Sequence, residues 1–254
     1  MSKKLDVVIV CDGYGDFLEH TLPYTKLFAD DIVVVTGMDD KYTEIVCKKN
    51  DVTFIKTYVH KYNDKFNKAL AINHGLAHLG LDSWVLQLDA DIIVPPVFRK
   101  WFSEAHLIEN RIYGVDRFDC NFEQWTKLKN ETDWLFRSRE WGFLIHPPSD
   151  VNKDLKLSCR VGHKAYHGAV VIGFFQLFNA KYKNRYPTKQ QADMEHTDLL
   201  HSSFYPPENR YLIPDFFTLH LTTDKKMGIN WKGRQSKLFG KPSLMGITNP
   251  YGDK

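Results

Sequence analysis

The chain has 254 residues, of which 43% are hydrophobic and 26% are charged, and its formal net charge is +3. This length and balance predict a folded protein with one sizeable core, in one large domain or two small ones. The sequence has no low-complexity segment, no internal repeat and no apolar run near the ~20 residues of a membrane helix, which excludes the fibrous, solenoid and membrane-spanning classes. The small positive charge permits a polyanionic partner without requiring one.

The cysteines and the N-terminal residues bear on the cellular compartment. The four cysteines are widely spaced and form no Cys-x-x-Cys motif: Cys11, Cys47, Cys120 and Cys159. Such cysteines are typical of reduced thiols in the cytoplasm. The first residues lead directly into a predicted strand and contain no apolar signal-peptide segment. We therefore expect a cytoplasmic protein.

The first eighty residues alternate between apolar strands and helices. Strands are predicted at 5–11, 31–36 and 52–57, and helices at 17–27, 43–49 and from Asn63 or Asp64 to about 78. Pro23 predicts a break or a new first turn in the first of these helices. The alternation predicts a mostly parallel sheet, whose ligands bind beyond the carboxyl ends of the strands. Acidic residues follow those ends: Asp12, Asp39, Asp40, Asp89 and Asp91. For Asp39 and Asp40, an ordinary polar turn is the alternative.

Two of these carboxylates, Asp89 and Asp91, end a predicted buried strand that begins at Trp84. Side chains two residues apart in an extended chain point to the same side. Two carboxylates cost too much to bury without a counter-ion, and hard oxygen ligands suit Mg²⁺ or Mn²⁺. The sequence therefore predicts a metal site here, with a solvated pair in a turn as the alternative.

The second half of the chain is less regular. Helices are predicted at 95–109 and 190–201, and strands at 112–118, 168–178 and 211–221. Pro214 places the last strand at a sheet edge or makes it begin after the proline. Between 119 and 167 the pattern degrades, and Trp, Arg and His gather, which is typical of a binding segment or of a satellite core under a loop. The basic residues after 222 predict a flexible loop and tail.

Several stretches together carry a resemblance to a known family. They are Val33-Val34-Val35-Thr36 with Asp39-Asp40, Phe66-Asn67-Lys68-Ala69, Leu88-Asp89-Ala90-Asp91, Glu195-His196-Thr197-Asp198, and Leu219-His220-Leu221 with the later Trp231-Lys232-Gly233-Arg234. In this order they resemble glycosyltransferases of the GT-A fold, in the broad family 2-like group, and the second stretch is similar to the Phe-Asn-Arg-Ala helix of galactosyltransferase-type enzymes. The resemblance implies a single α/β domain with a mixed, mostly parallel sheet flanked by helices. It also implies a nucleotide-sugar-binding half at 1–94, an acceptor half at 95–221 and a basic loop and tail at 222–254.

The resemblance also implies a role for each site residue. The metal, Mn²⁺ or Mg²⁺, would be bound by Asp89, Asp91 and His220. The nucleotide sugar would be bound by Asp12, Asp39, Asn67, Lys68, Asp89, Lys232 and Arg234, the last two contacting the diphosphate. The catalytic base would be Asp198 or Glu195, which lie three residues apart on one predicted helix face, so the choice stays open. The usual Glu-Asp or Asp-Asp dipeptide of the family's acidic helix is absent.

The implied activity is that of a metal-dependent inverting glycosyltransferase that uses a nucleoside-diphosphate sugar, expected to be a UDP-sugar. A nucleotidyltransferase would share the fold, but it normally needs a basic residue in a Gly-rich first turn, whereas that turn here is Asp12-Gly13-Tyr14-Gly15-Asp16. A non-catalytic sugar- or nucleic-acid-binding module is the alternative from another class.

The acceptor is expected to be a saccharide or a lipid-linked glycan, with a DNA base ranked second, as in small viral and phage enzymes that glycosylate DNA. Basic and aromatic side chains interleave between residues 125 and 167, which suits stacking on a sugar or base beside a phosphate backbone. Acidic residues in the same stretch and the small net charge argue against a duplex. The sequence does not indicate an oligomeric state.

Overall fold

The computed structural model describes residues 3–58, 67–80, 82–130, 170–182, 185–188, 197–223 and 236–240. Within these residues one sheet contains eight strands: β1 (Leu5–Val10), β2 (Asp31–Gly37), β3 (Thr53–Thr57), β4 (Trp84–Asp89), β5 (Ile92–Ile93), β6 (Ile112–Cys120), β7 (Phe175–Asn179) and β8 (Arg210–Leu221). The α-helices are α1 (Gly15–Thr25), α2 (Lys41–Lys49), α3 (Lys68–His78), α4 (Phe98–Glu104), α5 (Phe122–Leu128) and α6 (Thr197–Ser203), with a short 3-10 helix at Pro207–Asn209. None of the helices described is long and apolar enough to cross a bilayer.

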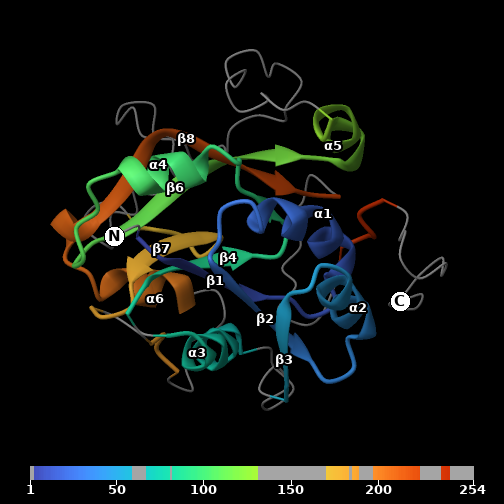
Figure 1. Ribbon diagram of the computed structural model, residues 1–254, viewed down its shortest axis with the longest axis horizontal. Coiled ribbons are helices and arrows are strands. Elements are labelled where there is room, and N and C mark those ends of the chain that lie inside the picture. Colours follow the sequence, from blue (N-terminus) through green and yellow to red (C-terminus); the bar gives the residue numbers. More distant parts are fainter. Residues whose placement is uncertain are drawn as a thin grey trace.

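The strands follow the order β3-β2-β1-β4-β7-β6-β8-β5 (Figure 1). β3, β2, β1 and β4 run parallel, β7 runs antiparallel to β4 and β6, and β8 runs parallel to β6 and antiparallel to β5. The predicted mixed, mostly parallel sheet is confirmed. The strands β1, β2, β4, β6 and β8 therefore all end on one side, which we name the carboxyl edge, and begin on the other, the amino edge.

Alternating side chains of β1 divide the interior into two cores. Val7 and Ile9 pack in the core that includes α1, α2 and α4, whereas Val8 and Val10 pack in the core that includes α3. Leu199 of α6 packs against the second core, and Figure 1 shows α3 and α6 on the same side of the central strands. Because both faces are covered, the central strands are mostly apolar, with few polar residues such as Asp6 and Gln87, rather than alternating between apolar and polar.

A third apolar cluster packs residues 236–240 against α1. Phe17 of α1 stacks on Phe239 with ring centroids 4.9 Å apart, and the backbone N–H of Phe239 donates to Asp16 at 2.6 Å. Trp125 of α5 belongs to the same cluster. Most of the tail predicted to be flexible lies outside the described residues; within 236–240, Phe239 is packed in this cluster and is only 1% exposed.

Two predicted elements are shorter than the sequence indicates. The helix expected at 95–109 is α4, which ends at Glu104, before the extended backbone of Ala105, and the Lys3 ammonium donates to the carbonyls of Phe102 and Ser103 at 3.1 and 3.2 Å. The strand expected at 168–178 begins only at Phe175. A contact between residues distant in sequence lies near each boundary, from Lys3 at the end of α4 and from Val171 to Ser202 before β7.

Other elements differ from the prediction in their ends or were missed. α1 continues through Pro23 to Thr25 instead of breaking. α5 was not predicted, although Asn121 and Gln124 form a complete capping box, a local signal for a helix start. The strand β8 contains Pro214, and its pairing with β6 is interrupted between Leu212 and Phe217, which accommodates a residue that lacks an N–H group.

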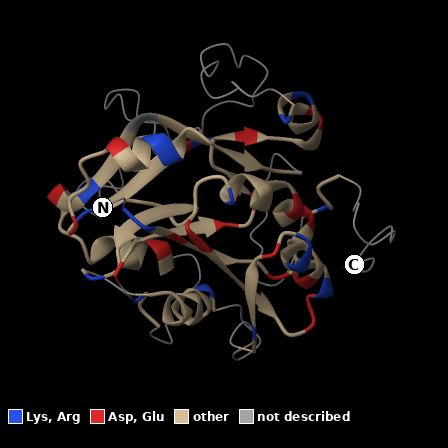
Figure 2. Ribbon diagram, in the orientation of Figure 1, with Lys and Arg blue, Asp and Glu red and all other residues tan. Residues whose placement is uncertain are grey.

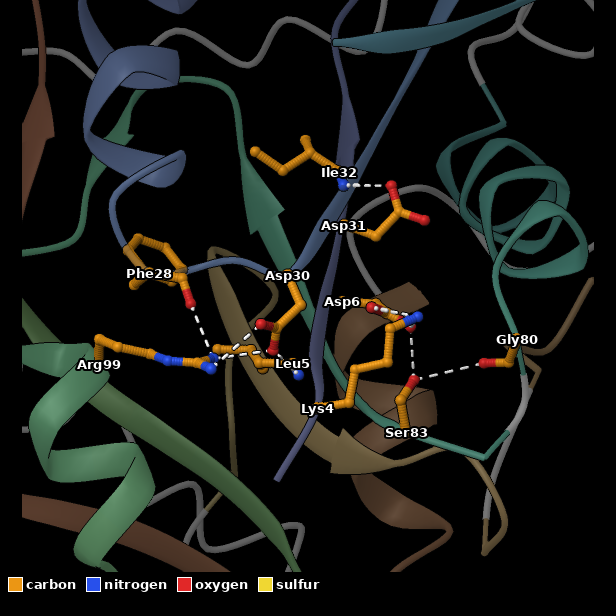
Figure 3. Close-up of polar contacts among 10 residues, drawn as sticks. All are labelled: Lys4, Leu5, Asp6, Phe28, Asp30, Asp31, Ile32, Gly80, Ser83 and Arg99. Carbon is orange, nitrogen blue, oxygen red and sulfur yellow. Dashed lines mark hydrogen bonds and ion pairs between the residues drawn. The ribbon is translucent and has the colours of Figure 1, made fainter. Parts of the chain in front are cut away.

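Ion pairs close the amino edge of the sheet (Figure 3). Asp30 accepts hydrogen bonds from the backbone N–H of Leu5 at 2.8 Å and from both terminal nitrogens of Arg99, at 2.8 and 3.1 Å. Buried Asp6 accepts from the hydroxyl of Ser83 at 2.6 Å, and its other oxygen lies 3.1 Å from the ammonium of Lys4. The carboxylates of this edge therefore join the beginnings of β1, β2 and β4 to each other and to α4.

Candidate active site

The turn after β1 and the end of β2 meet at the carboxyl edge. A Cβ atom added to Gly37 would overlap the carboxylate of Asp12, so the glycine allows this close approach. Several acidic residues lie around the turns between the central strands and helices α1 and α2 (Figure 2). Asp39 is exposed beside this turn. Asp12 and Asp39, both predicted to bind the nucleotide, therefore lie near the same turn.

Asp40, the neighbour of Asp39, has a structural role. Its carboxylate caps α2 by accepting from the backbone N–H of Thr43 at 3.0 Å, and it also accepts from the backbone N–H of Gly13 at 2.6 Å. Burial raises the pKa of Asp40, and these hydrogen bonds offset only part of that shift. Asp40 thus connects the turn after β1 to α2.

Asp91 and His220 form the first pair of the site. His220 Nε2 lies 3.3 Å from Asp91 Oδ2, and His220 Nδ1 lies 2.7 Å from Asp119 Oδ1. The strand pairing places them there, since His220 is the register partner of Asp119 in β6 and of Ile92, the residue after Asp91, in β5. The imidazole is therefore held between two carboxylates.

The pKa values of Asp91 and His220 are shifted by burial and by the charges of neighbouring groups, each other's included. Burial raises the pKa of Asp91, but the positive charges of His220 and Arg117 lower it by more, so the net shift is downward. Burial and Arg117 lower the pKa of His220, but Asp91 and Asp119 raise it by more, so the net shift is upward. Each partner thus stabilises the charged form of the other.

The pair fits a divalent metal. Asp91 Oδ1 is buried and has no hydrogen-bond partner among the described residues. A histidine whose second nitrogen is held by a carboxylate is the usual orientation of a metal-binding imidazole, and a mixed carboxylate and imidazole set suits Mn²⁺. Asp91 Oδ1 and His220 Nε2 are therefore the atoms suited to bind such an ion.

Asp89 lies apart from this pair. The ammonium of Lys68 lies 2.6 Å from Asp89 Oδ1, and Gln87 donates to the same oxygen at 3.2 Å. Burial raises the pKa of Asp89, and the Lys68 charge offsets only part of that shift. In the described part of the chain, no three His, Cys, Asp or Glu side chains are gathered closely enough to hold a metal. The three-residue metal set that includes Asp89 stays a prediction.

Asp198 completes the described site. It lies in the first turn of α6, and its carboxylate is 3.7 Å from the same Lys68 ammonium. The structure therefore brings Asp89 and Asp198 to one lysine. Asn67, predicted to bind the nucleotide, uses its side-chain oxygen to cap α3 by accepting from the N–H of Leu70 at 3.0 Å. Three predicted site residues lie outside the described residues: Glu195, Lys232 and Arg234. The helix cap expected at Asn63 or Asp64 lies outside them as well.

Sequence reasoning missed three residues that hold this site together: Asp119, Gln87 and Gly173. Gln87 is a fully buried polar side chain inside an apolar strand, which is a readable signal that something polar lies beside it. Gly173 interrupts an apolar run, which often marks a close approach. Asp119 could not be found, because its partner His220 is 101 residues away.

No protein-family model and no curated protein matches the chain. Solved structures do match. A mannosyltransferase from Pyrobaculum calidifontis, solved with GDP-Man and Mn²⁺, aligns with a TM-score of 0.55 at 12% identity, over 89% of this chain and 59% of that one. The chain has the GT-A fold. S. aureus TarS 1-349 aligns with a TM-score of 0.54 at 12% identity, over 86% of this chain and 60% of that one.

A third GT-A neighbour is glucosyl-3-phosphoglycerate synthase from Mycobacterium tuberculosis, solved with Mn²⁺ and UDP-Glc. It aligns with a TM-score of 0.50 at 14% identity, over 88% of this chain and 73% of that one. The chain thus spans 59% of the mannosyltransferase and 60% of the TarS chain. At identities this low, the structural similarity establishes the fold alone, and function has to be argued from the site.

Proposed function

We propose that the chain is a metal-dependent glycosyltransferase that moves a sugar from a nucleoside-diphosphate sugar to a hydroxyl acceptor. The observation that carries this proposal is the presence of two acidic pairs at the carboxyl edge of a GT-A fold, Asp91 with His220, and Asp89 with Asp198 on the shared Lys68. Two of the structures similar to this chain contain Mn²⁺ and a nucleotide sugar, GDP-Man in one and UDP-Glc in the other.

The donor side of the reaction would depend on Asp91 and His220. These residues would hold the metal, with Asp89 contributing directly or through the ribose and water, and Asp119 would keep the imidazole of His220 oriented. When bound, the metal supplies positive charge that stabilises the departing diphosphate. Asp12, Asp39, Asn67 and Lys68 are proposed for the nucleotide, and Lys232 and Arg234 for the diphosphate.

On the acceptor side, we assign the base to Asp198. Its carboxylate would take the proton of the acceptor hydroxyl as the acceptor oxygen bonds to the anomeric carbon. The bond from that carbon to the diphosphate breaks, and its electron pair leaves with the diphosphate. A single displacement of this kind inverts the anomeric configuration. Glu195 is the alternative base.

We propose a UDP-sugar as the donor and a saccharide or lipid-linked glycan as the acceptor. Nothing in the described residues adds weight to a DNA base as acceptor, so that alternative is not proposed. The segment predicted to bind the acceptor, 119–167, is described only up to residue 130.

A donor screen tests the proposed function. The protein is incubated with a series of UDP- and GDP-sugars and Mn²⁺, and the released nucleotide is identified, with and without EDTA. We expect a nucleoside diphosphate to be released even when water is the only acceptor. This release should stop when EDTA removes the metal. Release of pyrophosphate would instead indicate a nucleotidyltransferase, and donor binding without any hydrolysis or transfer would indicate a binding module. Turnover at the full rate in EDTA would contradict the metal role.

A further inference from the structure

The carboxylate of Asp198 occupies the space that a side chain at position 173 would fill. A Cβ atom added to Gly173 would overlap all three carboxylate atoms, far closer than real contacts allow. The backbone does not explain this glycine, because among the described glycines only Gly13 and Gly240 have positive φ angles. The missing side chain of Gly173 therefore matters because it leaves room for Asp198.

Lys68 holds the same carboxylate from another direction. Its ammonium lies 3.7 Å from Asp198, 2.6 Å from Asp89 and 3.3 Å from the carbonyl oxygen of Gly173. One partly buried ammonium group therefore connects Asp198 to the donor-side carboxylate Asp89.

The backbone around Asp198 is also fixed. The buried side chain of Gln176 in β7 donates to the carbonyl of Asp198 at 3.1 Å and to the carbonyl of Val171 at 2.7 Å. The N–H of Val171 donates to the hydroxyl of Ser202 in α6 at 2.9 Å. The first turn of α6 is therefore tied to the segment that contains Gly173.

We propose that Gly173, Lys68 and Gln176, named here the Asp198 cluster, are positioning residues that hold the base at one place relative to the donor carboxylate Asp89. This inference rests on the proposed function, because it takes Asp198 as the base. It assigns to Lys68 a role in joining base and donor site, beyond the nucleotide contact that the resemblance implies. It also assigns to Gly173 a role that no charge or hydrogen-bonding group reveals.

Gly173→Ala is the decisive variant, because it moves the carboxylate without removing it. A misplacement of about 1 Å can cost about 100-fold in rate. We expect kcat of donor hydrolysis or transfer to fall by about that factor, while the KM for the donor and the Kd for UDP with Mn²⁺ stay within about twofold, which is the scatter expected of independent sites. Gly80→Ala is the matched control, because an added Cβ there meets nothing within 4 Å.

A double-mutant cycle separates the cluster from the base. Asp198→Asn alone should lower kcat by about 10²–10⁴-fold. In that background Gly173→Ala should have almost no further effect, because the group that it displaces no longer acts as a base. If Asp198→Asn leaves turnover unchanged, both the base and its positioning are wrong. If Asp198→Asn lowers kcat but Gly173→Ala does not, or lowers it equally in both backgrounds, only the positioning proposal fails.

Lys68 variants test the connection to the donor side. Lys68→Met removes the cation from Asp89 and Asp198 together, so both a lower kcat and a higher donor KM are expected. Lys68→Arg retains the charge and should recover part of kcat. A Lys68→Met enzyme that changes only in donor KM would overturn the link to the base, and urea unfolding of each variant identifies losses caused by misfolding.

Discussion

The two edges of the sheet both contain acidic residues, but they use them differently. At the amino edge, the carboxylates bind different cations: Asp30 accepts two hydrogen bonds from Arg99 and one from the N–H of Leu5, and Asp6 accepts from Ser83 and lies 3.1 Å from Lys4. At the carboxyl edge, two carboxylates share one basic side chain: Lys68 lies between Asp89 and Asp198, and His220 lies between Asp91 and Asp119. Carboxylates that crowd around one basic group are costly to keep ionised, and such groups concentrate where a ligand interacts with them. The sharing of one basic group by two carboxylates, rather than acidity or burial, therefore distinguishes the candidate active site from the structural edge.

The largest expected effect separates the two edges directly. Asp91→Asn should lower the rate of transfer by more than about 100-fold. Mutation of a residue that only hydrogen-bonds to a metal ligand already lowers metal affinity or activity by about 10–100-fold. The matched variant at the amino edge, Asp30→Asn, should leave kcat unchanged and lower the free energy of unfolding by about 1–3 kcal/mol, the range for a lost charged hydrogen bond. Initial rates with saturating donor and urea unfolding measure both quantities.

The opposite pattern would contradict the comparison. An Asp91→Asn protein that turns over at the parent rate would place Asp91 among the structural carboxylates. An Asp30→Asn protein that folds normally but has lost activity would show that the amino edge affects the chemistry.

A smaller effect is expected for Asp119, which shares His220 with Asp91 at the carboxyl edge. Asp119 Oδ1 is 2.7 Å from His220 Nδ1, so Asp119→Asn should loosen the orientation of the imidazole. We expect the apparent affinity for Mn²⁺ to fall by about 10–100-fold, with most activity restored at high Mn²⁺. A titration of activity against Mn²⁺ measures this shift. Lost activity that excess metal does not restore would assign Asp119 a different role.

The parts of the fold that follow from local patterns were predictable. Continuous apolar runs identified β1 and β2 to within a residue, because strands buried on both faces need no alternation. The end of α4 was not predictable, because Lys3 caps it from almost 100 residues away. The start of β7 was not predictable either, because the residues before it are bound to α6.

For the candidate site, the sequence indicated which residues to consider but not how they contact one another. The rule that ligands bind beyond the strand ends selected Asp89 and Asp91, and the resemblance selected His220 and Asp198. Neither the rule nor the resemblance could reveal that Lys68 joins Asp89 to Asp198 or that Gly173 leaves room for Asp198, because both facts depend on where α6 packs. Residue types indicated the chemistry, whereas the pairing needed the tertiary structure.

A still smaller effect is expected at the amino edge when the paired cation is removed. Arg99→Met breaks the two hydrogen bonds to Asp30 while retaining an apolar side chain of similar length. Both side chains are about one-third exposed, so the loss should be no more than about 1 kcal/mol. For a chain of this size that corresponds to a fall in Tm of roughly 2–4 °C. Activity per folded molecule should not change, and a lower kcat at full folding would break the division between the two edges.

The smallest effect is the pH dependence of this same pair. Burial raises the pKa of Asp30, but the hydrogen bonds from Arg99 and Leu5 and the charge of Arg99 lower it by more, so the folded-state pKa lies below the unfolded value. Stability from such a group is present above the unfolded pKa of about 3.9 and is lost as the pH falls through the folded pKa. The difference in unfolding free energy between the parent and Arg99→Met should therefore be constant from about pH 7 to 5 and shrink below about pH 4. Urea unfolding across this range measures it, with Lys127→Met as the control, because its pair with Glu123 is exposed to solvent and should contribute little at any pH. A difference that stays constant as the pH falls would mean that Arg99 stabilises the fold through its apolar stem or through the Phe28 carbonyl, neither of which titrates, rather than through the charge of Asp30.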